Sequence, residues 1–131
     1  MRSMFQKDKG VGKMDEMDDV RDSPGEGGLT KRLQTELEIL HRHVLMLQTI
    51  KANEPIGIIR LAELLRHPQH KIRYSLRILE QEGLIRPSPE GAVSTDKVKE
   101  FIPQLESVLR DMETTVRKLR ETLGFNPHMP P

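Results

Sequence analysis

The chain is 131 residues long, about the size of one domain, and its charged residues leave a net charge of +1. It has no cysteine, which excludes a disulfide framework, thiolate metal sites and a cysteine nucleophile. Aromatic residues make up 3% of the chain, so the core must be aliphatic, which favours a small, mostly helical module over a deep enzyme fold. The longest apolar runs are four residues, against about 20 for a membrane span, and no signal-peptide pattern is seen, so we expect a cytoplasmic protein.

The two ends of the chain differ from its centre in composition. Residues 1–28 show no helical or strand period and end in a stretch rich in Gly and Pro, which predicts a disordered tail and linker. Residues 126–131 predict a second disordered tail. The folded part is therefore expected at 29–125, where 16 basic and 13 acidic residues leave a charge of +3.

A first helix is predicted from Thr30, whose hydroxyl is suited to cap it, to about residues 52–53, before Pro55. Apolar residues follow one another at alternating spacings of four and three, which is a heptad seam. This first seam consists of Leu33, Leu37, Leu40, Val44 and Leu47.

The middle of the chain predicts shorter elements. Residues 55–59 suggest a brief strand and 60–66 a short helix, and a second helix runs from Pro68, as its first residue, to about residue 82. Gly83 is a natural left-handed stop for that helix, whose buried stripe is Ile72, Leu76 and Leu79. Two short strands around a turn at 88–91 predict a compact hairpin.

The last helix is predicted to begin at a Ser94 or Thr95 cap and to carry an unbroken heptad seam from Val98 to Leu123. Twenty-nine helical residues would span roughly 43 Å. Pro103 is expected to kink or split the helix near residues 99–102.

This order of elements, with two short helices joined by a tight turn and followed by a hairpin, predicts a helix-turn-helix with a wing. The segments Ile58–Leu65 and Lys71–Ile85, with Leu-Ala-Glu-Leu in the first and Leu-Glu-Gln-Glu-Gly-Leu-Ile in the second, resemble winged helix-turn-helix transcriptional regulators of the MarR/ArsR-like type. Residues 43–95 resemble a set of predicted archaeal regulators of this class. The resemblance implies a mainly α fold with a β-hairpin wing at 29–94, followed by a dimerisation helix at 95–125.

The helix after Pro68 carries the residues that we expect to contact DNA. Four basic residues, two histidines and no acidic residue lie between Arg66 and Arg77. Exposed cations often do no more than solvate a helix, but in this order of elements we interpret them as a surface for double-stranded DNA. The predicted base-reading residues are Gln69, His70, Arg73, Tyr74 and Arg77, and the predicted backbone-holding residues are Arg66, Lys71 and Arg86.

The two heptad seams predict a symmetric homodimer, because the short elements cannot cover a seam of roughly 43 Å. The expected interface residues are Leu33, Leu37, Leu105, Leu109, Met112, Val116, Leu119 and Leu123. A second hypothesis is a winged-helix module that docks a protein partner and makes no DNA contact. No motif for catalysis or cofactors is present, and the histidines lack ligand spacing, so we expect no enzyme, cofactor or metal; an effector ligand is left open.

Overall fold

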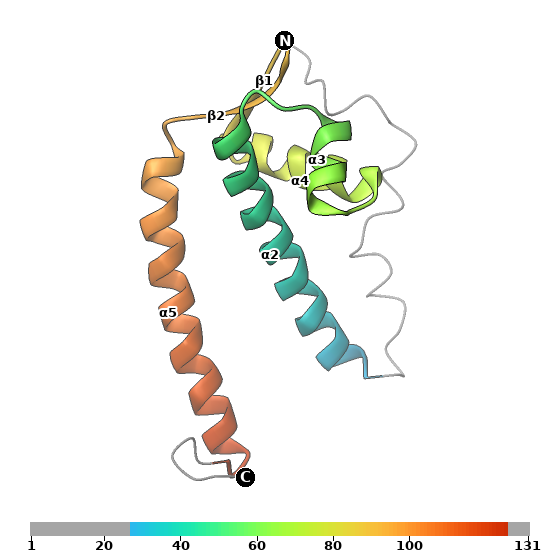
Figure 1. Ribbon diagram of the computed structural model, residues 1–131. Helices are drawn as coiled ribbons and strands as arrows, with labels where there is room; N and C mark the ends of the chain where they lie inside the picture. The colour runs from blue at the N-terminus through green and yellow to red at the C-terminus, as the bar shows by residue number, and fades with distance from the viewer. Residues whose placement is uncertain (1–26, 126–131) are drawn as a thin grey trace. The chain divides into compact units, whose positions relative to one another are not determined.

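In a computed structural model, which describes residues 27–125, the chain is mainly helical with one small antiparallel hairpin (Figure 1). This coarse fold class was predicted. Residues 1–26 of the tail predicted at 1–28, and the whole tail predicted at 126–131, lie outside the described residues. The end of the first predicted tail is wrong, because Gly28 already belongs to a helix. The chain divides into two compact units between Thr95 and Asp96. The described elements are α2 (Gly28–Asn53), α3 (Ile58–Leu65), α4 (Gln69–Gln81), β1 (Ile85–Ser88), β2 (Gly91–Ser94) and α5 (Val98–Thr122).

α2 begins and ends close to the predicted residues, but its cap differs. Gly27 holds the N-cap position in the left-handed region, with φ +70°, and Gly28 is already helical. The Thr30 hydroxyl donates to the Gly27 carbonyl at 3.0 Å, so it does not accept from a free amide as we expected. The reason is that the helix starts two residues earlier than Thr30, which places that hydroxyl inside the first turn.

Two different apolar faces run along α2. The buried face consists of Ile39, Arg42, Met46, Leu47 and Ile50, so it begins near the middle of the helix and runs toward its C-terminal end. The predicted seam is rotated away from this face by about 120°, at 100° per residue. Its first two members, Leu33 and Leu37, are 60% and 51% exposed, and Leu47 is the member that reaches the core. Figure 1 shows α3 and α4 beside the C-terminal half of α2 and its N-terminal half projecting beyond them.

The predicted strand at 55–59 is reduced to a single bridge. Ile56 exchanges two backbone hydrogen bonds with Ala92, of 3.2 and 2.8 Å. Ile58 and Ile59 already belong to α3, whose N-cap is Gly57. The start of the predicted strand is extended, as expected at Ile56. Its second half instead forms the first turn of the amphipathic helix α3.

α4 is bounded by Pro68 and Gly83. Pro68 is the N-cap and not the first helical residue, and its carbonyl accepts from the amides of Lys71 and Ile72. At the other end Gly83 has φ +77°, and the amide of Leu84 donates to the Leu79 carbonyl at 3.0 Å. This six-to-one bond across a left-handed glycine is a Schellman motif, so the predicted glycine stop is confirmed.

Besides the buried Ile85 and Ala92, a carboxylate and a glycine hold the hairpin against the rest of the first unit. The strands pair from Ile85 opposite Ser94 to Ser88 opposite Gly91. The Glu54 carboxylate, just after α2, accepts from the Ser94 amide at 2.6 Å and from its hydroxyl at 2.9 Å. Gly91 has φ +137°, and a Cβ there would lie 2.5 Å from the carbonyl carbon of Ile56. The bridge therefore needs a residue without a side chain.

α5 runs unbroken from Val98 to Thr122 through Pro103, so the predicted split does not occur. Pro103 lies in the second turn, where it removes one backbone donor close to the end of the helix. Ser94 and Thr95 do not cap this helix as predicted, because Ser94 is bound to Glu54 and the Thr95 hydroxyl donates to the Gly83 carbonyl. The 25 residues span roughly 38 Å, somewhat less than expected.

The Gly91→Ala substitution should destabilise the first unit by about 2 kcal/mol or more, because the methyl group meets the Ile56 backbone and the φ angle disfavours L residues. Urea unfolding followed by circular dichroism measures this loss. Gly57→Ala is the control, because a Cβ at Gly57 meets no heavy atom of residues 27–125 within 4 Å. We expect it to cost less than about 1 kcal/mol. Equal losses for the two variants would contradict the role given to the Ile56–Ala92 bridge.

Candidate nucleic-acid interface

α4 has a buried side that sets the direction of all its other side chains. Ile72, Ser75, Leu76 and Leu79 are buried. They pack in the first unit, where α4 contacts α2, α3 and β1. Ser75 lies among the apolar positions of the predicted stripe, which widens the buried side toward α2. The remaining side chains of α4 must point to solvent or lie along its flanks.

The exposed side of α4 carries four of the predicted base-reading residues, which we call the reading face: Gln69, His70, Arg73 and Arg77. Gln69 and His70 are exposed, and Arg73 and Arg77 are half-buried. Gln69, Arg73 and Arg77 follow one another at intervals of four residues, so they form one row along the helix. The Arg73 guanidinium donates to the Gln69 side-chain oxygen at 3.3 Å.

Tyr74 lies against α2 and is half-buried, not on the open side of α4 where the helical wheel places it. Its ring centroid is 5.8 Å from that of His43, and the guanidinium of Arg42 is 5.9 Å from the ring. On α4 itself, the Arg77 guanidinium lies 6.0 Å from the same ring. The wheel treats α4 as an isolated helix, whereas α2 covers the flank next to Ser75. Tyr74 thus supports Arg77 through a cation–π contact.

A buried polar cluster, absent from the sequence analysis, joins α2 to α4. Arg42 is 5% exposed, and its Nε donates to the Ser75 hydroxyl at 2.8 Å. Nδ1 of His43 lies 2.9 Å from the same hydroxyl oxygen. The sequence holds one signal for it, because Arg42 follows Ile39 by three residues and precedes Met46 by four, the register of the buried face. Burying a cation costs free energy unless polar groups meet it, so Ser75 is not interchangeable with an apolar residue.

The predicted backbone-holding residues lie at three different places. Arg66 is exposed at the C-terminal end of α3, where its backbone is left-handed with φ +57°. Lys71 is half-buried on the flank of α4 that faces α2. Arg86 is exposed on β1, opposite Val93. All three belong to the first unit, as does the reading face.

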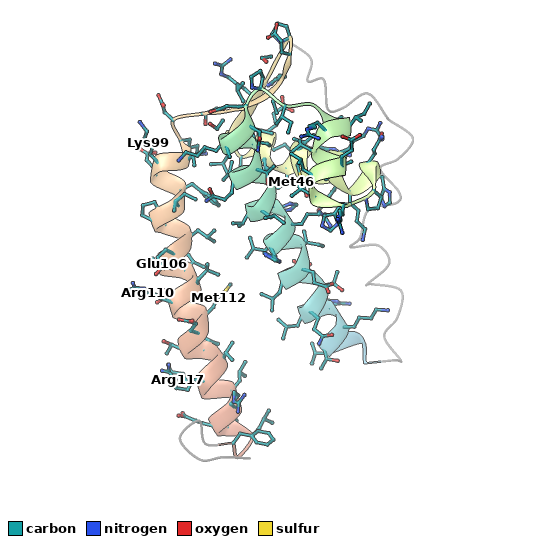
Figure 2. The ribbon with its side chains drawn as sticks, viewed as in Figure 1. Met46, Lys99, Glu106, Arg110, Met112 and Arg117 are labelled. Carbon is teal, nitrogen blue, oxygen red and sulfur yellow. The ribbon has the colours of Figure 1, made fainter. Side chains whose placement is uncertain are left out.

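The predicted interface residues on α5 are mostly exposed. Exposure rises from 37% at Leu109 to 73% at Leu123, and Leu105 is half-buried. Figure 2 shows Met112 on one side of α5 and the basic Arg110 and Arg117 on the other. Arg110 pairs with Glu106, one turn earlier, at 2.7 Å. The second unit therefore presents an apolar side and a charged side.

Comparisons with known proteins give no matching family model and no significant match among curated proteins. Among residues 27–125, no helix is both long and apolar enough to cross a membrane. Within the same part of the chain, no group of three or more His, Asp or Glu side chains is placed to hold a metal ion.

The Ser75→Ala substitution removes the buried acceptor for Arg42 and should lower the free energy of unfolding by about 1–3 kcal/mol. Urea unfolding of the full chain measures this change. Ser107→Ala, at an exposed position of α5, deletes the same hydroxyl and should leave stability within about 0.5 kcal/mol. A Ser75→Ala protein as stable as the wild type would show that the cluster does not hold α2 to α4.

Proposed function

We propose that this chain is a winged helix-turn-helix protein that binds double-stranded DNA as a homodimer and regulates transcription. In this proposal α3 and α4 are the helix-turn-helix, α4 is the recognition helix, and the β1–β2 hairpin is the wing. The order of these elements supports it, and so does the Ile56–Ala92 bridge, which ties the segment before α3 to the hairpin.

The observation that carries the proposal is the division of α4 into a buried side and a polar, cationic reading face. An α-helix about 10–12 Å across fits the major groove of B-DNA, which is about 12 Å wide. Arginine binds guanine through two hydrogen bonds and glutamine binds adenine in the same way. Arg73, Arg77 and Gln69 are therefore the proposed base readers, and His70 adds a further donor or acceptor at the exposed N-terminal turn.

Backbone phosphates are the proposed contacts of Arg66, Lys71 and Arg86. Contacts of this kind position a protein on the duplex and make its affinity depend on salt. The hairpin has one basic residue, Arg86, and carries Glu90 in its turn, so its share of the phosphate contacts is small. Most of the electrostatic attraction then comes from residues 66–77, which hold four cationic side chains.

A second copy of the chain is the proposed partner of the exposed seams. The α5 seam keeps its heptad spacing from Val98 to Leu123, and side chains at that spacing pair with another helix of the same kind. Leu33 and Leu37 add exposed apolar surface at the N-terminal end of the α2 seam. A two-fold dimer presents two recognition helices to successive major grooves about 34–36 Å apart, on a near-palindromic site. Occupation of a promoter then blocks or recruits the transcription machinery.

The Arg77→Ala substitution should weaken binding to duplexes that the wild-type protein selects from a random pool by about 1–3 kcal/mol, with a smaller loss on unselected duplexes. Arg73→Ala should behave in the same way. Fluorescence anisotropy at several salt concentrations measures both affinities. The control is Arg110→Ala, which removes the same charge from an exposed residue of α5.

An equal loss on selected and unselected duplexes would contradict base reading by Arg77. A wild-type protein that binds no duplex at low salt would instead favour the second hypothesis, a module that docks a protein partner. The exposed apolar seams are the surfaces that such a partner would contact.

Leu109→Asp and Val116→Asp should each turn the dimer into a monomer, because a carboxylate in the seam would be buried against the partner helix. Multi-angle light scattering of the full chain measures the mass. Thr114→Asp, at an exposed position outside the seam, should leave the dimer intact. A mass unaffected by both seam substitutions would show that the α5 seam is not the dimer contact.

A further inference from the structure

A groove in the first unit lies between α2 and the start of α4. Its volume is about 530 Å³, within the range of sites that hold small molecules. α2 lines one wall and the residues around Pro68 line the other. The lining residues are Lys31, Thr35, Glu38, His41, Arg42, Leu45, His67 and Lys71.

Most of the α2 side chains that line the groove follow the helical repeat. Lys31, Thr35, Glu38, Arg42 and Leu45 follow at spacings of four, three, four and three, so they share one side of the helix. This side is separate from the seam of Leu33 and Leu37. α2 therefore has a buried face, an apolar seam and a mostly polar row that faces the groove, and Arg42 belongs to both the buried face and this row.

The charges around the groove are strongly unbalanced. Among the lining residues that belong to 27–125, Lys31, Arg42 and Lys71 are cations and Glu38 is the one carboxylate, which leaves +2 for this part of the lining with its two imidazoles neutral. Arg42 is 5% exposed, so one of these cations is built into the protein and does not extend freely into water. A phosphate monoester carries a charge of about −1.5 to −2 at neutral pH, which matches this imbalance. The Thr35 hydroxyl adds a donor, and Leu45 provides an apolar wall for an organic group.

We propose that this groove, the basic groove, binds a small metabolite that carries a phosphate monoester, and that the bound anion lowers the affinity for DNA. The second half rests on the proposed function. Arg42 lines the groove and also contacts Ser75 and the Tyr74 ring, on which Arg77 lies. An anion beside Arg42 and Lys71 adds negative charge next to α4, and a negative charge there opposes the approach of DNA phosphates.

Glycerol 3-phosphate is the probe for the binding step, and glycerol at the same concentration is its uncharged control. Titration of the isotope-labelled full chain at constant ionic strength should give saturable shifts of the backbone amides of Thr35, Glu38 and Lys71. Glu38→Gln should tighten the fitted Kd about five-fold, because it removes a like charge at short range. Glu36→Gln, an exposed residue two positions away, should leave the Kd within about two-fold.

Lys31→Gln should weaken binding about five-fold, whereas Lys51→Gln, on the same helix outside the groove, should not. Shifts that do not saturate would overturn the basic groove as a binding site. Equal effects of the groove variants and their controls would do the same, because the anion would then follow the overall charge of the protein.

The regulatory step is tested by adding glycerol 3-phosphate to the duplex-binding assay at constant ionic strength. The ester should weaken duplex binding by the wild type several-fold more than by Lys31→Gln. Duplex binding that does not respond to a saturating ester would overturn the regulation while leaving the proposed function intact. Saturable ester binding without any duplex binding would support the groove and overturn the proposed function. If Lys31→Gln lowers the affinity for duplex DNA when no ester is present, the groove holds DNA phosphates.

Discussion

The contact between Arg42 and Ser75 is the interaction on which the rest of the first unit depends. It joins residues 33 positions apart in the chain and places a nearly buried cation between α2 and α4. Because Ser75 sits among Ile72, Leu76 and Leu79, this bond acts together with their apolar packing to fix the rotation of α4 against α2. The side of α4 that faces solvent follows from that rotation. The proposed base-reading residues are thus oriented by the apolar packing of α4 and by a polar bond within the core.

The same contact connects surfaces with different proposed roles. The Tyr74 ring lies near Arg42 and His43 of α2 and also near the Arg77 guanidinium of α4. Arg42 also lines the basic groove. A ligand in the groove and a base contact at Arg77 would therefore act on neighbouring parts of one cluster. Coupling of this kind needs no large movement, since a change of charge beside α4 is enough to alter attraction for DNA.

The long helices α2 and α5 extend beyond what is needed to form the core. The core positions of α2 run from Ile39 toward its C-terminal end, and α5 leaves most of its seam exposed. Monomeric proteins rarely keep apolar surface of this extent in water, and its heptad spacing is typical of helix pairing. Self-association would relate two copies of α4 by a two-fold axis. Two small domains can then contact two half-sites of a longer DNA site. In the proposed function the seams thus contribute as much to DNA recognition as the reading face.

The sequence by itself determined the features that depend on a few neighbouring residues. The Gly83 stop, the hairpin around residues 88–91, the end of α2 before Pro55 and the position of the reading face on α4 are of this kind, because backbone preferences and helical periodicity act locally. Tertiary structure decided which apolar side of α2 is buried, where Tyr74 lies, and which hydroxyl groups are taken by distant partners, as Ser94 is by Glu54. A periodic pattern shows that a side is apolar but not what covers it. The buried Arg42–Ser75 bond and the basic groove arise only when segments far apart in the chain are brought together.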